Sequence, residues 1–273
     1  MMNTMFRKFH IFTLIFTGHL FLLDPAGITW SQSIPQNKFH EQKVKQIEFD
    51  IISRIEKTFD HILWEEVLRK DGIRVQRKKL GKDSIFALKS VGVLKAPIES
   101  IITIFRDTKN AHLWAPGLKQ RTLLKNISEL EAVVYDIHEM PWPCQERDVV
   151  MFNTIKLLTS RKQIALISSS IENYKLDPKP GNKVRAELHY SYIGLTPISK
   201  NETFVEFFIH VDPKGSLPKW IVNHIVKTRP FSFLKAIEKR ASNTPANLGE
   251  STLKLVDRLK TILSNGKFIT GSL

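Results

Sequence analysis

The sequence predicts an α+β fold in which short strands form a sheet and a long C-terminal helix covers one face of it. Between residues 212 and 240, bulky apolar side chains recur mostly at steps of three and four, and most charged side chains fall between them. Most of the chain before residue 212 instead forms short alternating or β-branched runs separated by turn residues. Because such a sheet must bury one face, the helix is its natural cover.

Residues 1–33 have the pattern of a secretory signal peptide. Arg7 and Lys8 precede an apolar run at 9–23, and Ser31 and Ser33 provide a small-residue cleavage site. The apolar run is about 15 residues long, whereas a membrane-spanning helix needs about 20. The sequence therefore predicts export to the periplasm or the outside of the cell, with an uncleaved membrane anchor as the alternative.

The rest of the chain divides into a helical extension at 34–62, a main domain at 63–241 and a tail at 242–273. A helical pattern runs from Asn37 to Arg69 and gives way to a turn at Asp71-Gly72. In the main domain we expect a first strand at Ile73, a helix at 97–105, loops at 110–120 and 196–201, and further strands at 85–94, 122–126, 131–140, 147–158, 163–171, 184–195 and 202–211. The tail predicts a short amphipathic helix after Glu250, which either docks on a surface or frays.

The strand at 131–140 alternates clearly between two faces. Ala132, Val134, Asp136 and His138 point one way, and the residues between them point the other way. One of the two faces should line the interior of the domain.

Two prolines mark the C-terminal helix. Pro218 stands at a first-turn position, where the missing backbone N–H is not needed, so the helix should begin there. Pro230 lies inside the helical pattern and removes one backbone hydrogen bond, so a kink or short break is expected near Thr228-Arg229.

Three blocks of residues resemble one known family. They are W-x6-D-G-I-x-V at 64–75, P-W-P-x3-R-D-x-V at 141–150, and D-P-x-G-x-L-P-x-W-I-x-N at 212–223. In this order they are similar to START domains, the steroidogenic-acute-regulatory-related lipid-transfer modules, and most of all to members like phosphatidylcholine-transfer protein. The resemblance spans Trp64 to Arg240, which is nearly the whole main domain.

The resemblance implies a helix-grip fold of the START and Bet v 1-like type, in which a curved antiparallel sheet wraps around the C-terminal helix. It further implies one phospholipid, sterol or related lipid in an internal tunnel gated by that helix. No cofactor, metal or catalytic residue is expected. Candidate ligand-binding residues are Asp136, His138, Arg147, Asn153, His189, Tyr192, Trp220 and His224. Cholesterol-carrying members have an arginine where this chain has Asn153, so a cholesterol assignment is in doubt, and Arg147 and Asp148 are expected to form structural pairing at the sheet rim.

The formal net charge of +14 favours anionic partners. For an exported protein the abundant anionic surface is a membrane, so we expect transient contact with an anionic membrane and no nucleic acid. Cys144 is the only cysteine, so the chain forms no internal disulfide. We expect a monomer.

Two other classes of function stay open. A helix-grip enzyme, such as an aromatase or cyclase, would need a short polar cavity. Asp136 and His138 share a strand face, and His189 or His210 could approach them to form a proton-transfer pair, although the sequence has no G-x-S-x-G or H-E-x-x-H motif. A basic adaptor with a filled core would need no cavity at all.

Overall fold

The computed structural model describes residue 53 and residues 64–79, 86–171 and 181–266. These residues belong to one compact unit, Gln46–Leu273. The expected signal peptide at 1–33 lies outside the described residues, and so does the expected extension at 34–62 apart from Ser53. Within the described ranges, every helix is too short or too polar to cross a bilayer.

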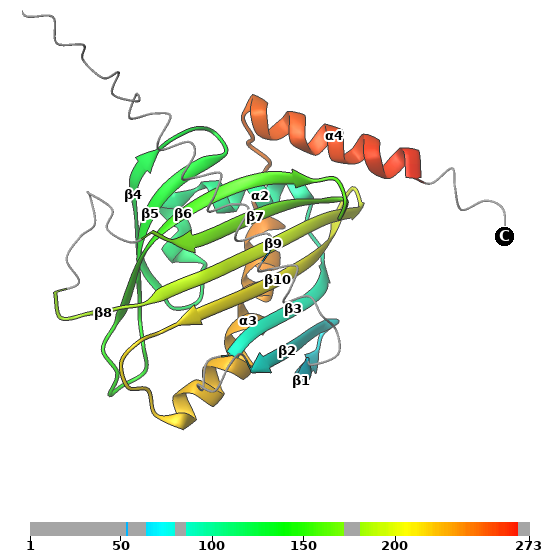
Figure 1. Cartoon of the computed structure of the whole chain (residues 1–273). Helices are drawn as coiled ribbons and strands as arrows, with labels where there is room; N and C mark the ends of the chain where they lie inside the picture. Colours follow the sequence, from blue (N-terminus) through cyan, green and yellow to red (C-terminus); the bar gives the residue numbers. More distant parts are fainter. Residues whose placement is uncertain (1–52, 54–63, 80–85, 172–180, 267–273) are drawn as a thin grey trace, which may run out of the picture. The chain divides into compact units, whose positions relative to one another are not determined.

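The main element is a large curved sheet in which adjacent strands of the main path run antiparallel (Figure 1). Together with the helices, it confirms the expected α+β class. Its strand order is β1-β2-β3-β10-β9-β7-β6-β5-β4, and β8 runs parallel to β6 at one point off this path. The strands are β1 (Glu65–Lys70), β2 (Ile73–Lys79), β3 (Phe86–Leu94), β4 (Leu118–Asn126), β5 (Glu131–His138), β6 (Arg147–Leu158), β7 (Gln163–Ser170), β8 (Val184–Arg185), β9 (Glu187–Ser199) and β10 (Glu202–Asp212).

The first hairpin corrects one expectation. Residues 65–69 were predicted as the end of a helix, but they form β1, which pairs with β2 from Lys70 and Ile73 onward. Asp71 and Gly72 have φ values of 48° and 73°, as a two-residue hairpin turn requires. The turn signal was therefore right, and the strand before it was missed because its charged residues also suit an exposed helix.

The largest other differences from the sequence prediction are at β4 and β9. β4 begins at Leu118, four residues before the expected start. The expected strand at 184–195 is interrupted at Ala186, and β9 then continues to Ser199, so the predicted loop at 196–201 shrinks to a tight turn. Pro197 is tolerated in β9 because the register shifts beside its partner Thr203, where a ladder hydrogen bond can be omitted.

The helices are α2 (Ile98–Arg106), the 3₁₀ helix η2 (Thr108–Leu113), α3 (Lys219–Ala241) and α4 (Glu250–Gly266). α3 follows Pro218 directly, as predicted. The predicted short break is wrong, because α3 is continuous through Pro230. Its axis nevertheless changes direction between its gold start and its orange end (Figure 1). The buried ring of Pro230 packs inside the fold, and the Ser90 hydroxyl donates to its carbonyl at 3.4 Å.

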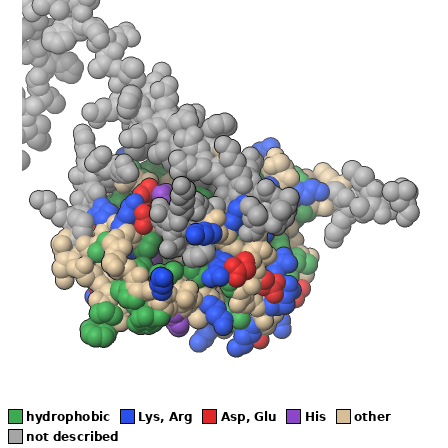
Figure 2. Space-filling model, turned by 60° about the horizontal axis from the view of Figure 1, so that its bottom comes forward, with side chains coloured by type: hydrophobic (Ala, Val, Ile, Leu, Met, Phe, Trp, Pro, Cys, Tyr) green, Lys and Arg blue, Asp and Glu red, His purple; other side chains and the backbone are tan. Residues whose placement is uncertain are grey.

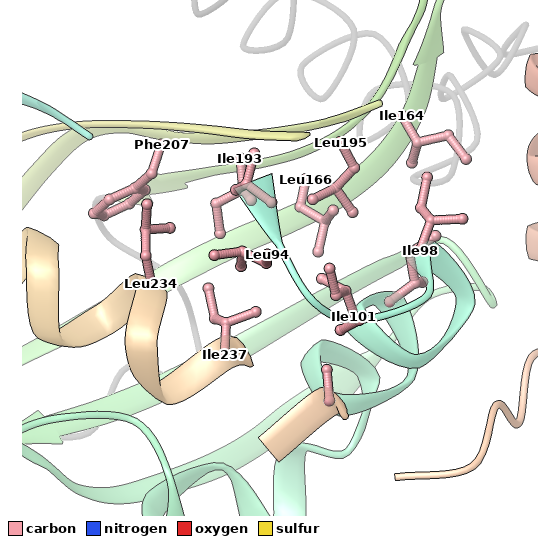
Figure 3. Close-up of a cluster of buried hydrophobic side chains, with 14 of the residues drawn as sticks. Leu94, Ile98, Ile101, Ile164, Leu166, Ile193, Leu195, Phe207, Leu234 and Ile237 are labelled. Atoms are coloured by element: carbon pink, nitrogen blue, oxygen red, sulfur yellow. The ribbon is translucent and has the colours of Figure 1, made fainter. Parts of the chain in front are cut away.

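The main apolar core lies beside the second half of α3 (Figure 3). Leu234 and Ile237 of α3 meet Ile98 and Ile101 of α2 and the inner face of the sheet. Each fully buried side chain of this kind contributes about 1.5 to 3 kcal/mol. The remaining labelled members are Leu94, Ile164, Leu166, Ile193, Leu195 and Phe207. The fully buried α3 side chains of this core, Leu234, Ile237 and Ala241, all come from the second half of the helix.

Arg147 and Asp148 hold the rim of the sheet, each with its own partners. Arg147 donates to the carbonyls of Gln145, Pro213 and Lys214 at 2.6, 2.9 and 3.0 Å, so it ties the start of β6 to the loop before α3. The fully buried Asp148 accepts from Tyr135 at 2.9 Å and from Arg185 at 3.0 and 3.1 Å. Both residues thus have structural contacts at the rim, but they do not pair with each other.

Candidate functional site: a cavity between the sheet and α3

A cavity of about 750 Å³ lies between the inner face of the sheet and the first half of α3. On the helix it is lined by Val222, Ile225, Val226, Arg229, Pro230 and Phe233. After these residues, the apolar side chains of α3 (Leu234, Ile237 and Ala241) pack in the main core and do not line the cavity. The volume falls within the range of about 300 to 1,000 Å³ that is typical of small-molecule sites.

Strand alternation decides which side chains reach the cavity. Ala132, Val134, Asp136 and His138 of β5 line it, so this face of the alternating strand is the inner one. From the neighbouring strand β6 come Val149, Met151 and Asn153, again at every second position. Most of the wall is apolar, and further apolar side chains come from β9 and β10: Leu188, Ile193, Phe207, Ile209 and Val211.

A buried ion pair interrupts this apolar wall. Arg121 of β4 donates to Asp136 of β5 through Nε to Oδ1 at 2.7 Å and through Nη2 to Oδ2 at 2.5 Å. Asp136 is fully buried. Burial disfavours the charged form of Arg121, but the Asp136 carboxylate outweighs that effect and the pKa of Arg121 is raised. Arg121 therefore stays charged and is held in one position at the cavity wall by its two hydrogen bonds to Asp136.

His138 extends the polar region. Its Nε2 lies 3.8 Å from Oδ2 of Asp136. Burial lowers the pKa of His138, Asp136 opposes that change, and the Arg121 and Arg229 guanidinium groups reinforce it. Although 36% of its side-chain surface is accessible, His138 lines the cavity, where a charge is poorly solvated. With a pKa below its usual 6.5, the imidazole is neutral at pH 7 and can both donate and accept a hydrogen bond.

Arg229 connects α3 to the opposite rim of the cavity. Its Nη1 donates to the Pro116 carbonyl at 2.9 Å and its Nη2 to the Glu139 carbonyl at 3.1 Å. Gly117, with φ 72°, makes this approach possible, since a Cβ there would lie 1.8 Å from the guanidinium. Burial lowers the pKa of Arg229 and Glu139 opposes the change, yet an arginine remains charged at neutral pH. We refer to these two hydrogen bonds as the Arg229 latch.

The structure brings four of the eight predicted site residues to the cavity. Asp136, His138, Arg147 and Asn153 line it. Among these, Asp136 and His138 lie side by side, while Arg147 stands at the rim beside the loop before α3.

The other four predicted site residues lie away from the cavity. Tyr192 is buried on the opposite face of the sheet, where its ring meets Phe208 and its hydroxyl donates to Gln163. His189 is also on that face and stacks on His210, with 4.3 Å between the ring centroids. The expectation that these two histidines could approach Asp136 and His138 is therefore corrected.

Trp220 and His224 are one turn apart on the outer side of α3, where Trp220 is 58% exposed. Helical periodicity explains their place, because Ile221 of the same turn is fully buried and faces inward. They belong to the surface around the start of α3 and not to the cavity wall.

Sequence reasoning missed Arg121 and assigned no cavity contact to Arg229. Arg121 is directly opposite Asp136 in the β4–β5 pairing, so an alternation argument could have found it. However, the pairing of β4 with β5 has two register shifts, between Leu118 and Gln120 and between Leu123 and Lys125, so strict alternation along β4 does not predict which residue lies opposite Asp136. Trp114, which lies in the predicted loop at 110–120, lines the cavity and packs on Phe105 and Phe233.

The described residues contain no group of three or more His, Cys, Asp or Glu side chains that could hold a metal ion. The charged and titratable groups of the cavity wall are instead four arginines, three carboxylates and one imidazole, and they stand among hydroxyl, amide and apolar side chains. This arrangement can orient a polar head group and solvate an apolar body.

Comparison with known proteins gives a consistent picture. The family model described as START domain matches residues 55–246. Phosphatidylcholine transfer protein of Bos taurus is 23% identical over 182 residues, which cover 66% of this chain and 84% of that protein.

Solved structures show the same fold. Human StAR-related lipid transfer protein 5 superposes with a TM-score of 0.64 at 16% identity, covering 74% of this chain and 97% of that chain. A STAR-related lipid transfer protein from Xanthomonas axonopodis superposes with a TM-score of 0.57 at 25% identity, covering 65% of this chain and 98% of that chain. The expected curved sheet wrapped around a C-terminal helix is thereby confirmed.

Proposed function

The chain belongs to the START domain family, and from that premise we propose that it binds one lipid in the cavity beneath α3 and transfers it between membranes. The observation that carries the proposal is the cavity itself, whose apolar wall surrounds a buried Arg121–Asp136 pair. A lipid chain gains about 0.8 kcal/mol for each methylene that it buries, so a cavity of this size can hold it against loss to water. No bond is made or broken in this proposal.

The polar region of the cavity would orient the head group. Arg121, Asp136 and the neutral His138 offer a donor, an acceptor and a group that can be either. Buried polar groups of this kind cost free energy unless they are paired, so a ligand is favoured when its own polar atoms meet them. A phosphate, hydroxyl or ester oxygen satisfies this requirement.

Lipid entry would require α3 to move away from the sheet. The first half of α3 packs over the cavity and its second half over the main core, so the first half has less apolar packing to lose. Two arginines hold it closed: Arg229 through the latch, and Arg147 through the carbonyls of the preceding loop. Opening the cavity means breaking these few hydrogen bonds.

The surface near the start of α3 would meet the membrane. Trp142 and Trp220 are 87% and 58% exposed, and Arg147 links the loop that carries Trp142 to the loop that precedes α3 and Trp220. Figure 2 views the side on which α3 begins and shows apolar side chains next to Lys and Arg. Tryptophan is favoured at the boundary between lipid and water, and each nearby lysine adds about 1 kcal/mol toward an anionic surface. The exposed Lys219 and Lys227 are suited to this, since Arg229 is engaged in the latch.

Native mass spectrometry of the purified protein tests the lipid proposal. We expect one lipid mass per chain, which is lost after denaturation and solvent extraction. Met151→Trp, which fills the cavity, should lower lipid occupancy at least tenfold, whereas Lys125→Trp on an exposed strand position should not. A protein that is always empty would favour the adaptor, and turnover of an aromatic polyketide substrate would favour the cyclase class.

Sedimentation with vesicles tests the membrane surface. The double variant Trp142→Ala/Trp220→Ala should bind phosphatidylserine-containing vesicles about 10 to 100 times more weakly, because two exposed aromatic side chains no longer enter the lipid. Ile198→Ala provides the control. It removes a 54% exposed side chain near the end of β9, beside the turn into β10, whereas α3 follows the other end of β10. Equal binding of both variants would show that another surface docks.

The proposal also places the protein outside the cytoplasm as a monomer. N-terminal sequencing of the mature protein checks the export, and light scattering checks the oligomeric state.

A further inference from the structure

A groove of about 450 Å³ lies beneath α4, at the opposite end of the fold from the start of α3. Leu130, Ile155 and Leu157 line it from the sheet side, and Leu255 and Arg258 line it from α4. α4 begins after the segment that the family model matches, which ends at residue 246. The groove is therefore built partly from an element outside that segment.

The groove adjoins the large cavity. Five residues line both: Ser128, Leu130, Glu131, Thr154 and Ile155. They come from the start of β5, the middle of β6 and the turn before β5. The cavity thus runs from the loop before α3, past the Arg121–Asp136 pair, to side chains that also line the groove beneath α4.

α4 is held against the domain at its first turn and along its buried side. Glu129 accepts from the backbone N–H groups of Ser251 and Thr252 at 2.8 and 2.9 Å and from the Thr252 hydroxyl at 2.6 Å, so it caps the start of the helix. Val256 and Leu259 are buried in the main core, and Lys260 pairs with Glu99 of α2 at 2.6 Å. A helix held in this way forms a defined wall and not a frayed tail.

We infer that the groove receives the distal part of a long acyl chain whose head group lies at the Arg121–Asp136 pair, and that α4 sets the chain length that the protein accepts. This inference rests on the proposed lipid-binding function. Its physical basis is that the groove extends the apolar wall from Leu130 and Ile155, which line both spaces, to Leu157 and Leu255, and that Leu255 is only half-buried. Each methylene that enters raises affinity about fourfold.

Leu255→Trp tests the inference by filling the groove from the helix side. The matched control is Leu253→Trp, which places the same side chain on the 43% exposed face of the same helix. Each protein is stripped of lipid, incubated with an equimolar mixture of phosphatidylcholines carrying chains of 14 to 22 carbons, and analysed by native mass spectrometry. We expect Leu255→Trp to shift the bound mixture toward chains shorter by two or more carbons, with the longest species reduced about 4- to 16-fold.

The control should bind the same mixture as the unaltered protein. Leu255→Ala, which widens the groove, should shift the mixture toward longer chains and gives an independent readout if the tryptophan variant folds poorly. Bound lipid with an unchanged chain-length profile in both Leu255 variants would overturn the inference and leave the proposed function intact. If the unaltered protein binds no phosphatidylcholine and carries no other lipid, both fail together.

Discussion

Asp136→Ala is expected to lower the free energy of unfolding of the lipid-free protein by about 3 to 5 kcal/mol. The substitution leaves the Arg121 guanidinium without its paired carboxylate at a site where it is largely shielded from water. The Asp136 carboxylate is itself fully buried, so its pairing energy is not weakened by solvent as a surface pair would be. Urea denaturation followed by tryptophan fluorescence measures the change.

A double variant separates the ion pair from the space that it occupies. Arg121→Met/Asp136→Leu replaces both charges with apolar groups of similar size, and we expect its stability to lie within about 2 kcal/mol of the unaltered protein, because no charge is left unpaired. Equal losses in the single and double variants would mean that packing, and not the charge, explains the effect. An Asp136→Ala protein with unchanged stability would mean that water solvates Arg121 adequately.

Ligand binding gives the same variant a second readout. If the head group of the lipid lies at this pair, a phosphate-bearing lipid can take the place of the lost carboxylate beside Arg121. Added phosphatidylcholine should then raise the melting temperature of Asp136→Ala more than that of the unaltered protein, since at a given concentration a ligand that binds more tightly stabilises the folded state more. A neutral diacylglycerol should lack this selective effect.

The order of elements could be read from the sequence because turn and cap residues act locally. Pro218 fixed the start of α3, and Asp71-Gly72 fixed the first turn, whatever the rest of the chain does. Strand β1 and the continuity of α3 through Pro230 depend instead on distant partners, namely β2 and the packing of Pro230 beside Ser90. Local patterns could not reveal these contacts.

The candidate site was only half predictable for a similar reason. Alternation along β5 correctly grouped Asp136 with His138, because that strand has no irregularity against β6. A plain alternation along β9 puts His189 and Tyr192 on opposite faces, but the strand is interrupted at Ala186 and its register against β10 shifts between His210 and Val211. One such shift reverses the face of every following residue. The partner of Asp136 was missed because β4 carries two shifts of the same kind.

A protein whose α3 is covalently tied to the opposite rim should lose lipid transfer almost completely. The variant Cys144→Ser/Ala115→Cys/Arg229→Cys removes the only native cysteine and places two new ones beside the Arg229 latch, which joins α3 to the Pro116 carbonyl. A short bismaleimide with an internal disulfide links the two cysteines. Transfer of a fluorescent phosphatidylcholine between vesicles is then measured before linking, after linking and after reduction.

The same variant tests α3 in two states, without the Arg229 latch before linking and tied to the rim after linking. Before linking it lacks the latch, and since hydrogen bonds from a charged donor contribute about 1.5 to 3 kcal/mol, the open state should be about 10 to 100 times more populated and transfer correspondingly faster. After linking, α3 cannot leave the rim, and transfer should stop while lipid already inside stays bound. Variants with one new cysteine, treated with the same reagent, control for the modification alone. Because linking leaves Trp142 and Trp220 of the proposed docking surface unaltered, undiminished transfer by the linked protein would exclude α3 as the gate and favour entry through the groove beneath α4.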